Sequence, residues 1–422
     1  MATRKDQSEV AQLQTLIENY EAEQSNTLSL LASANYSSQH IRNFSASTLS
    51  DITTEGYPGK RYHPGARYAD EVEDLACALA KKVFRSSYAN VQPHSASSAN
   101  SAILIELLQP GDVLTGLELS AGGHLTHGAS PSFSGRLFDS KPYRLVGETI
   151  DYDYILDHAR TIKPRVIICG ASAYPRKISF KNFREIADQV NAILLADISH
   201  ISGFVAANLH ESPIEFAHAV TTSTYKQLAG PRGGIILASG ESVPGTESRN
   251  IGNLLDHSVF PRTQGTPDLA NIAAKGATLA FCLTPDFQQR MQLTLNLATQ
   301  LSQELTSNGF RLVAGGTDTH MVVIDLRKIG ISGKYAEEIL ESVGILANRN
   351  LIPDDQGSPK IPSGLRLGTN TLATRGFDIE GVSRIVRVIS RLLKKGPTAD
   401  LRSAKLEVES ICYDYPIPRQ GT

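Results

Sequence analysis

The chain has 422 residues, 41 of them Lys or Arg and 43 Asp or Glu, so it is long enough for two packed domains and carries a formal net charge of −2. This balance excludes the basic surface of a nucleic-acid-binding protein and the polybasic patch of a membrane-bound one, and no stretch approaches the ~20 apolar residues of a membrane span. With no apolar signal segment at the start and four cysteines that lack metal-ligand spacing, we expect a cytoplasmic protein that acts on a small molecule and holds no metal.

Two helical patterns occupy the first 84 residues. Residues 7–24 carry apolar side chains at helical spacing with charges between them, which predicts an amphipathic helix that can act as an arm onto a partner. Residues 68–84 place apolar side chains on one face behind an acidic start, as in a helix with a favourable dipole. We expect this second helix to open the large domain.

A turn of small residues at 95–100 precedes an apolar helix pattern that runs through Leu108. A helix N-terminus with free N–H groups and nearby hydroxyls is suited to bind phosphate, so we assign Ser97 and Ser98 to that role. Serine-rich turns at this position are more commonly simple helix caps, so the assignment depends on the residues elsewhere in the chain. A strand is expected at 112–117, just before a Gly-Gly turn.

Strands and helices alternate from residue 165 onward. Strand patterns at 166–168, 192–196 and 219–224, with a helix at 180–190, predict βαβ units and a largely parallel sheet covered by helices, an α/β fold. A helix from Thr284-Pro285 to about residue 308 leads into a smaller domain. There we expect strands at 310–314, 321–326 and 365–368 and helices at 334–343 and 379–395.

Lys226 and Asp197 indicate the chemistry. Lys226 lies between hydroxyl-rich residues 221–224 and a Gly/Pro-rich turn, where a partly desolvated amine can lose its proton and attack a carbonyl. A single lysine is usually a solvated surface residue. However, Asp197 ends an apolar strand, and the carboxyl ends of parallel strands face the ligand crevice. A lysine that holds an aldehyde and a carboxylate that pairs with a ring nitrogen are the two fixed points of an enzyme that uses pyridoxal 5′-phosphate (PLP).

The segments around both residues resemble serine hydroxymethyltransferase, as do TEGYPGKRY at 54–62, NVQPHS at 90–95 and GGHLTHG at 122–128. The resemblance extends from about Leu28 to Tyr415. It implies PLP fold type I, the aspartate-aminotransferase-like fold, with a mostly parallel seven-stranded sheet in the large domain and a smaller α+β C-terminal domain. We expect an N-terminal helical arm at 1–27, the large PLP-binding domain at 28–283 and the small domain at 284–422.

The resemblance also implies the catalytic and cofactor-binding residues. Lys226 would hold the cofactor, His124 would lie flat on its ring, and Glu55 would donate or accept a proton. His200 would hydrogen-bond the phenolic oxygen of PLP or the substrate side chain, and Asp197 would keep the ring nitrogen protonated. The implied cofactor-binding set is Ser97, Ser98, His124, Ser172, Asp197, His200, Ser223 and Lys226.

Amino-acid and folate positions follow in the same way. Arg366 would grip the substrate carboxylate by two parallel hydrogen bonds, although a strand-edge arginine paired with a surface acid is the alternative. The implied substrate-binding residues are Ser33, Tyr62, His63 and Arg366. Tetrahydrofolate is the expected co-substrate, with Leu119, Gly123, Leu125 and Asn350 at its site and Tyr62 beside the pterin. Glu55 and Tyr62 would reach across from a second subunit, so a homodimer with shared active sites is implied.

Several positions depart from the family pattern at or near the cofactor. These are Ala34, Thr53, His63, Tyr225 and Arg262-Thr263. The expected activity is PLP-dependent breaking or forming of the Cα–Cβ bond of a β-hydroxy amino acid, a reaction of one-carbon metabolism. The substrate would be serine with tetrahydrofolate, or a variant such as α-methylserine. Alternatives are a folate-independent threonine aldolase or L-threonine transaldolase, and a catalytically silent PLP-binding homologue.

Overall fold

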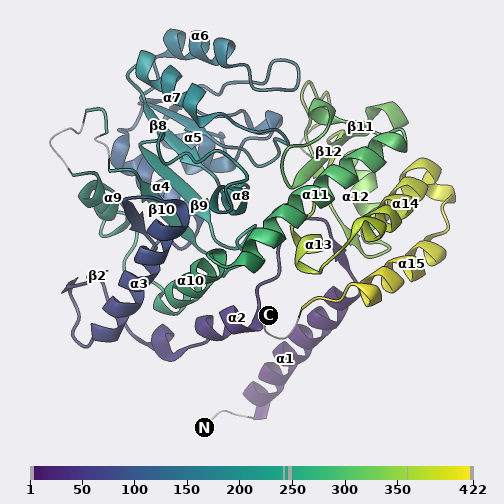
Figure 1. Cartoon of the computed structure of the whole chain (residues 1–422), viewed down its shortest axis with the longest axis horizontal. Helices are drawn as coiled ribbons and strands as arrows, with labels where there is room; N and C mark the ends of the chain where they lie inside the picture. The colour runs from purple at the N-terminus through teal and green to yellow at the C-terminus, as the bar shows by residue number, and fades with distance from the viewer. Residues whose placement is uncertain (1–3, 241–242, 246–249, 359, 419–422) are drawn as a thin grey trace.

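The computed structural model describes residues 4–240, 243–245, 250–358 and 360–418, and its larger domain is built on a seven-stranded sheet (Figure 1). The strand order is β4-β10-β9-β8-β7-β5-β6. Of these strands, β10 runs antiparallel to both of its neighbours, and the others run parallel to one another. The expected mostly parallel seven-stranded sheet is therefore confirmed. Its strands are β4 (Tyr88–Asn90), β5 (Val113–Thr115), β6 (Asp139–Ser140), β7 (Val166–Cys169), β8 (Ile193–Asp197), β9 (Ala219–Ser223) and β10 (Gly234–Ala238).

Helices cover both faces of this sheet because successive side chains of its strands point to opposite faces. In β8, Leu194 joins one core and Leu195 the other, and both are fully buried. One core lies under α4 (Ala96–Leu107) and α9 (Ile251–Val259). The other packs against α3 (Arg67–Phe84), α6 (Tyr152–Ile162), α7 (Phe180–Gln189) and α10 (Leu269–Cys282). Burial on both faces explains why the sequences of β7, β8 and β10 are apolar along almost their whole length.

The smaller domain is built on an antiparallel sheet in the order β11-β12-β15-β14. The strands are β11 (Arg311–Leu312), β12 (Met321–Asp325), β14 (Asn348–Asn350) and β15 (Gly364–Gly368). The helices around it are α12 (Gly333–Glu341), α13 (Asn370–Thr374), α14 (Ile379–Lys395) and α15 (Leu401–Asp414). The strand expected at 310–314 is shorter than predicted, because Ala314 adopts a left-handed conformation with φ of 54° that no strand accommodates.

Helix α11 (Pro285–Ser307) joins the two domains, as the Thr284-Pro285 signal predicts. The Thr284 side chain caps it by accepting the N–H of Phe287. Phe287 and Met291 belong to the core of the large domain, whereas Leu297 and Leu301 belong to that of the small one. Figure 1 shows α11 running diagonally between the two bodies.

The expected start of the large domain at residue 28 differs from the packing. Strand β1 (Leu28–Ser29) pairs in parallel with β13 (Ile345–Leu346), and Leu28 and Leu30 are buried in the core of the small domain. Burial in either core would stabilise two leucine side chains by a similar free energy, so their spacing in the sequence does not indicate which core they join. The tertiary structure decides it. The remaining bounds of the domain division stay proposals.

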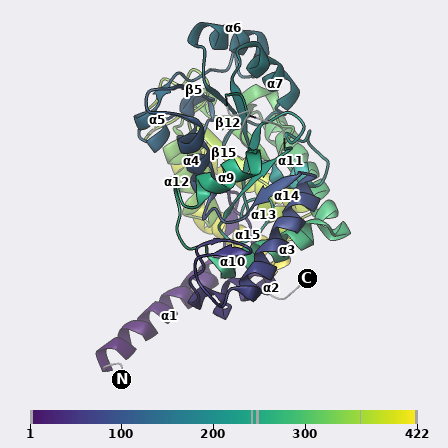
Figure 2. The same ribbon diagram turned by 90° about the vertical axis from the view of Figure 1, so that its left-hand side faces the viewer.

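Helix α1 (Arg4–Ser25) extends away from the rest of the chain (Figures 1 and 2). Its apolar residues Val10, Leu13, Leu16 and Ile17 are each more than half exposed. The other short elements are α2 (Gln39–Ser45), β2 (Gly56–Tyr57), β3 (Lys60–Arg61), α5 (Phe133–Leu137) and α8 (Ser202–Ala206). Among the described residues, no helix has the length and apolar character needed to cross a membrane.

Candidate active site

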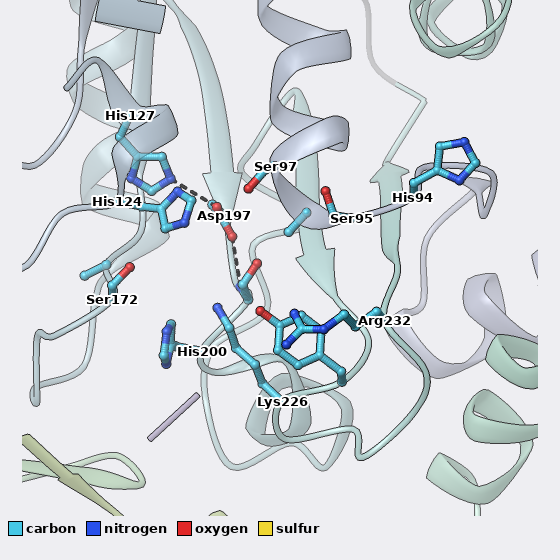
Figure 3. Close-up of a pocket in the computed structure, with 14 residues that line it drawn as sticks. His94, Ser95, Ser97, His124, His127, Ser172, Asp197, His200, Lys226 and Arg232 are labelled. Carbon is cyan, nitrogen blue, oxygen red and sulfur yellow. Dashed lines mark hydrogen bonds and ion pairs between the residues drawn. The ribbon is translucent and has the colours of Figure 1, made fainter. Parts of the chain in front are cut away.

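One pocket at the carboxyl ends of the parallel strands brings together six of the residues expected from the sequence (Figure 3). Asp197 is the last residue of β8, and Lys226 follows β9. The expected residues that line the pocket are Ser97, His124, Ser172, Asp197, His200 and Lys226. The structure thus places these side chains around one space, and their individual roles stay predictions.

Asp197 is held by hydrogen bonds from three elements. Its Oδ2 accepts from Nδ2 of Asn100 at 2.8 Å and lies 3.0 Å from Nε2 of His127. Its Oδ1 accepts from the backbone N–H of Ser199 at 3.0 Å. Burial alone would raise the pKa of this carboxyl, but the His127 hydrogen bond and the positive charge nearby outweigh it and hold the pKa well below its usual range. Asp197 is therefore an ionised acceptor at neutral pH.

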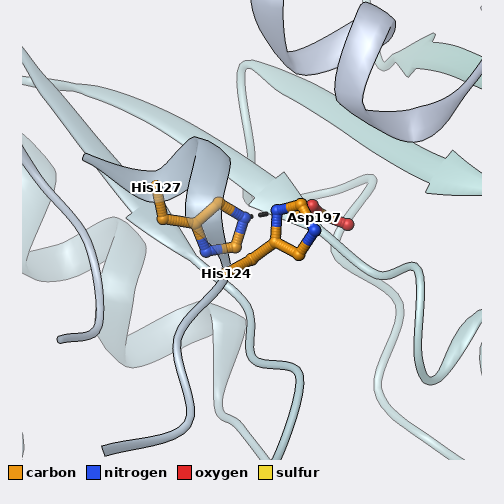
Figure 4. Close-up of side chains that lie close together, drawn as sticks. All are labelled: His124, His127 and Asp197. Carbon is orange, nitrogen blue, oxygen red and sulfur yellow. Dashed lines mark hydrogen bonds and ion pairs between the residues drawn. The ribbon is translucent and has the colours of Figure 1, made fainter. Parts of the chain in front are cut away.

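Asp197, His124 and His127 also form a group that could hold a metal ion, with one candidate ligand atom of each within 4.8 Å of the others (Figure 4). Their hydrogen bonds favour a different role. Oδ2 of Asp197 already accepts two of them, and Nδ1 of His124 lies 2.8 Å from Oγ1 of Thr126. These bonds orient the carboxylate as an anchor for a cationic N–H group.

Lys226 is 7% exposed and points toward Asp197 and His200 in Figure 3. Burial lowers the pKa of its amine to about 8; the charge of Asp197 opposes this shift, and Arg366 and Arg232 add to it. A neutral amine is the form that attacks an aldehyde. The surroundings of Lys226 thus favour the chemistry expected from the sequence over an ordinary surface lysine.

Arg366 presents a half-buried guanidinium at the junction of the two domains. Its Nη1 donates to the carbonyl oxygen of Ser172 at 2.6 Å, and its Nη2 donates to Oδ1 of Asn348 at 2.9 Å. Nε is buried without a partner, and burial lowers the pKa of the group to about 10. Within the described ranges no carboxylate forms an ion pair with it, so pairing with a surface acid does not explain this arginine.

His200 stacks on His320, with ring centroids 5.6 Å apart and planes at 18°. Burial lowers the pKa of His200 well below its usual value, and its Nδ1 has no hydrogen-bond partner among the described residues. Nε2 of His320 lies 3.0 Å from the carbonyl oxygen of Ala32, the residue before Ser33. The residue before the expected carboxylate-binding Ser33 therefore contacts this pair of histidines, whereas Ser33 itself does not line the pocket.

Of the serines expected at the phosphate and cofactor, Ser97 and Ser172 line the pocket and Ser98 and Ser223 do not, and their roles stay predictions. Ser95 caps α4, and its Oγ accepts the N–H of Ser98 and lies 2.9 Å from the Ser98 hydroxyl. Ser95 and Ser97 line the pocket, whereas Ser98 does not, because its polar groups bond to the cap. Ser223 also lies outside the lining, and its hydroxyl donates to the carbonyl oxygen of Ser199 at 3.2 Å.

Known proteins match this chain along almost its full length. A model of the family described as serine hydroxymethyltransferase matches residues 6–389. A protein named serine hydroxymethyltransferase from Borrelia turicatae (strain 91E135) is 42% identical over 409 residues, covering 96% of this chain and 98% of its own. One of the same name from Prochlorococcus marinus (strain MIT 9515) is 43% identical over 408 residues, covering 96% and 95%. The chain belongs to the serine hydroxymethyltransferase family.

The pocket fits the PLP that this family uses. The ionised Asp197 is placed to pair with a protonated ring nitrogen, and Lys226 supplies the amine for the aldehyde. The helix N-terminus at Ser95 and Ser97 faces the same space and suits a phosphate. The unpartnered Nδ1 of His200 is a polar atom that a bound ligand can satisfy.

The serine hydroxymethyltransferase residues expected to act across subunits lie outside this pocket. Glu55 is half-buried, and its N–H donates to Nδ1 of His63 at 3.4 Å. Tyr62 is 75% exposed and packs on Phe260 with centroids 5.7 Å apart. Glu55, Tyr62 and His63 therefore sit together on the β2–β3 hairpin region but do not line the pocket of their own chain.

Two of the expected folate residues, Leu119 and Leu125, are exposed on the large domain, Gly123 is buried there, and Asn350 lies on the small domain. Leu119 and Leu125 are 41% and 48% exposed, and Leu119 lines a neighbouring hollow together with His124. Gly123 is buried, and an added Cβ would lie 1.9 Å from the carbonyl oxygen of Leu117, so only glycine fits. Asn350 ends β14, and its amide donates to the carbonyl oxygen of Leu351. Their assignment to folate stays a prediction.

Two departures from the family pattern have visible partners. The ring of Tyr225 carries the guanidinium of Arg232 at 4.4 Å from its centroid, and both line the pocket beside Lys226. Arg262 pairs with Glu106, with Nε 2.7 Å from Oε2. Neither replacement is therefore a free surface change.

The sequence did not reveal the residues that hold the site residues in place from distant parts of the chain. Asn100 lies in the small-residue turn and His127 three residues after His124, yet neither received a role. Ser95, Ser199, Asn348 and His320 were also missed. A signal existed only for Ser95, since a serine three residues before a second serine at a helix start is a typical cap.

Proposed function

We propose that the protein transfers the hydroxymethyl group of serine to tetrahydrofolate, giving glycine and methylene-tetrahydrofolate, with PLP in the pocket of Lys226. The observation that carries this proposal is the arrangement of Lys226 and the ionised Asp197 in one pocket, with the guanidinium of Arg366 bonded to the carbonyl oxygen of Ser172, a residue that lines that pocket. PLP, when bound, supplies the electron sink that lets the Cα–Cβ bond break. The protein supplies binding, orientation and proton transfer.

Each step of that contribution has a candidate residue. Arg366 and Ser33 hold the substrate carboxylate, which orients the amino acid over the cofactor. Asp197 keeps a proton on the ring nitrogen, because the hydrogen bond and charge of His127 hold its own pKa low against the effect of burial, while the amide of Asn100 orients the carboxylate. Glu55 moves a proton at the substrate hydroxyl or at the folate amine.

The direct test compares serine, threonine and α-methylserine, each with and without tetrahydrofolate. We expect serine to be converted to glycine only when folate is present, with methylene-tetrahydrofolate formed in equal amount. Cleavage of threonine with no effect of folate on any of the three would replace this function by an aldolase or transaldolase. Absence of turnover with bound PLP would support the silent homologue.

A shifted amino-acid preference is the second candidate, and Tyr225 with Arg232 is the observation that favours it. The stacked pair lines the pocket directly beside Lys226, where the family usually has histidine at position 225. We expect Tyr225→His to raise kcat/KM for serine relative to α-methylserine. An unchanged ratio would show that this position does not set the preference.

We also propose a homodimer in which each site takes Glu55 and Tyr62 from the partner, and a cytoplasmic location. The support is that both side chains lie outside the pocket of their own chain, while ion pairs of Arg61 with Asp70 and Glu73 anchor the hairpin that carries them to α3. In a twofold dimer of shared sites, mixing Glu55→Gln with Lys226→Ala chains creates one intact site in each mixed dimer. Two separately inactive variants should then recover about a quarter of the wild-type activity, by random pairing of equal amounts. No recovery after confirmed subunit exchange would show that the sites are not shared.

A further inference from the structure

Lys275 is a buried lysine that the proposed chemistry does not use. It lies on α10 and is 2% exposed. Its ammonium donates to three backbone carbonyl oxygens, those of Val91 at 2.6 Å, Pro93 at 2.9 Å and Gly234 at 3.2 Å. No carboxylate of the described chain forms an ion pair with it. Lysine is almost never buried without a carboxylate partner. The burial of Lys275 against backbone carbonyl oxygens alone therefore suggests a specific role for this side chain.

The three carbonyls belong to the two segments that flank the cofactor pocket. Val91 and Pro93 lead into Ser95, the cap of α4 and the start of the phosphate-side turn. Gly234 begins β10, and its N–H also donates to the Pro93 oxygen at 2.9 Å. Lys275 therefore bridges two segments that are far apart in sequence at the point where they touch.

The second segment is connected directly to Lys226. The carbonyl oxygen of Gly233 accepts the N–H of Thr224 at 3.1 Å, two residues before Lys226. An added Cβ at Gly233 would lie 2.1 Å from Cε of Lys275. One at Gly234 would lie 2.3 Å from the carbonyl oxygen of Ser95. The two glycines thus let the lysine stem and the phosphate-side turn approach the Lys226 loop.

We propose that Lys275 is a positioning residue that fixes the phosphate-side turn at Ser95 and Ser97 relative to Lys226. PLP is held at both ends, by its phosphate and by its aldehyde, so binding both requires a fixed separation of the two segments. An apolar side chain would fill the same volume but remove the ammonium donor from all three buried carbonyls, and the Pro93 oxygen would keep the N–H of Gly234. Loss of these hydrogen bonds favours separation of the two segments. The proposal rests on the proposed cofactor site and on no property of the amino-acid substrate.

The test measures PLP binding in a series with decreasing numbers of donors. Lys275→Gln keeps two N–H donors, and Lys275→Met keeps none at a similar length. We expect the Kd of PLP for the apoprotein, measured by equilibrium dialysis, to rise about tenfold or more in the methionine variant and less in the glutamine variant, which corresponds to about 1.4 kcal/mol per tenfold. If the methionine variant does not fold, the glutamine variant carries the test.

Leu279→Ala is the matched control, because Leu279 is fully buried on the same helix, packs in the core of the large domain and has no side-chain hydrogen-bond donor. It should lower the thermal midpoint of apoprotein and holoprotein equally, whereas the Lys275 variants should also reduce the midpoint gain on adding PLP. Variants that bind PLP as the wild type does while losing stability like Leu279→Ala would overturn the proposal. Failure of the wild type to bind PLP would instead refute the cofactor site itself.

Chemical rescue gives a second readout that a packing role would not produce. Lys275→Ala leaves a space bordered by the three carbonyls, which a small ammonium ion can enter and hydrogen-bond. We expect ethylammonium to restore PLP affinity at least severalfold, and tetramethylammonium, which has no N–H, to have no effect. Equal effects of the two salts would show that the carbonyl contacts do not position the cofactor turn.

Discussion

The lowered pKa of Lys226 makes a prediction about how the apoprotein captures its cofactor. Capture needs the neutral amine, and an amine with a pKa of about 8 is about one-quarter neutral at pH 7.5. An ordinary lysine is neutral in only about one molecule in a thousand at that pH. The burial of Lys226 therefore raises the reactive fraction by about 200-fold.

We expect the rate of PLP capture to rise with pH up to about 8 and to level off above it. The assay mixes apoprotein with excess PLP between pH 6 and 10 and follows the absorbance of the free aldehyde. Nα-acetyl-lysine under the same conditions separates the titration of PLP itself from that of Lys226. Lys226→Ala should show no capture.

Two variants should move this inflection in opposite directions. Arg366 lowers the pKa of Lys226 through its charge, so Arg366→Gln should move the inflection to higher pH. Asp197 raises that pKa, so Asp197→Asn should move it to lower pH. An inflection at the pH of the free amine, or shifts of both variants in the same direction, would refute the electrostatic reasoning.

Three further predictions concern the residues around the site. Asn100→Ala removes a hydrogen bond to the charged Asp197, and such a bond contributes about 1.5 to 3 kcal/mol. The kcat should therefore fall about 10- to 100-fold while the cofactor content is preserved. An unchanged kcat would show that Asp197 is held in place without this hydrogen bond. Arg366→Lys should weaken serine binding about tenfold or more in a spectroscopic titration, because the point charge of a lysine cannot replace two parallel N–H hydrogen bonds. An affinity equal to that of the wild type would show that other residues bind the substrate carboxylate. Leu28→Ala should lower the free energy of unfolding by about 2 to 5 kcal/mol in thermal unfolding, because Leu28 is buried in the core of the small domain. Leu406→Ala, at an exposed leucine, should lower it by less than about 0.5 kcal/mol, and similar values for the two variants would contradict the packing of β1 on the small domain.

The sequence by itself determined the sheet and the two chemical residues. Apolar runs such as residues 192–196 have one stable place, a strand buried on both faces, and the residue after such a run lies at the sheet edge where ligands bind. Asp197 follows from that rule, and Lys226 from its position between the hydroxyl-rich residues 221–224 and a Gly/Pro-rich turn. Helix α11 follows from Thr284 and Pro285, because capping is a local interaction between residues close in sequence.

Only the tertiary structure decided what holds those residues in place. Asn100 and His127 reach Asp197 from 97 and 70 residues earlier in the chain, and Lys275 reaches Val91 across 184 residues. Leu28 joins the small domain although it precedes the large one. Such contacts leave no periodic pattern, because hydrogen bonds and packing across the fold depend on which segments meet in space. Local sequence patterns predict the secondary structure of a segment, but not which distant segments it will contact.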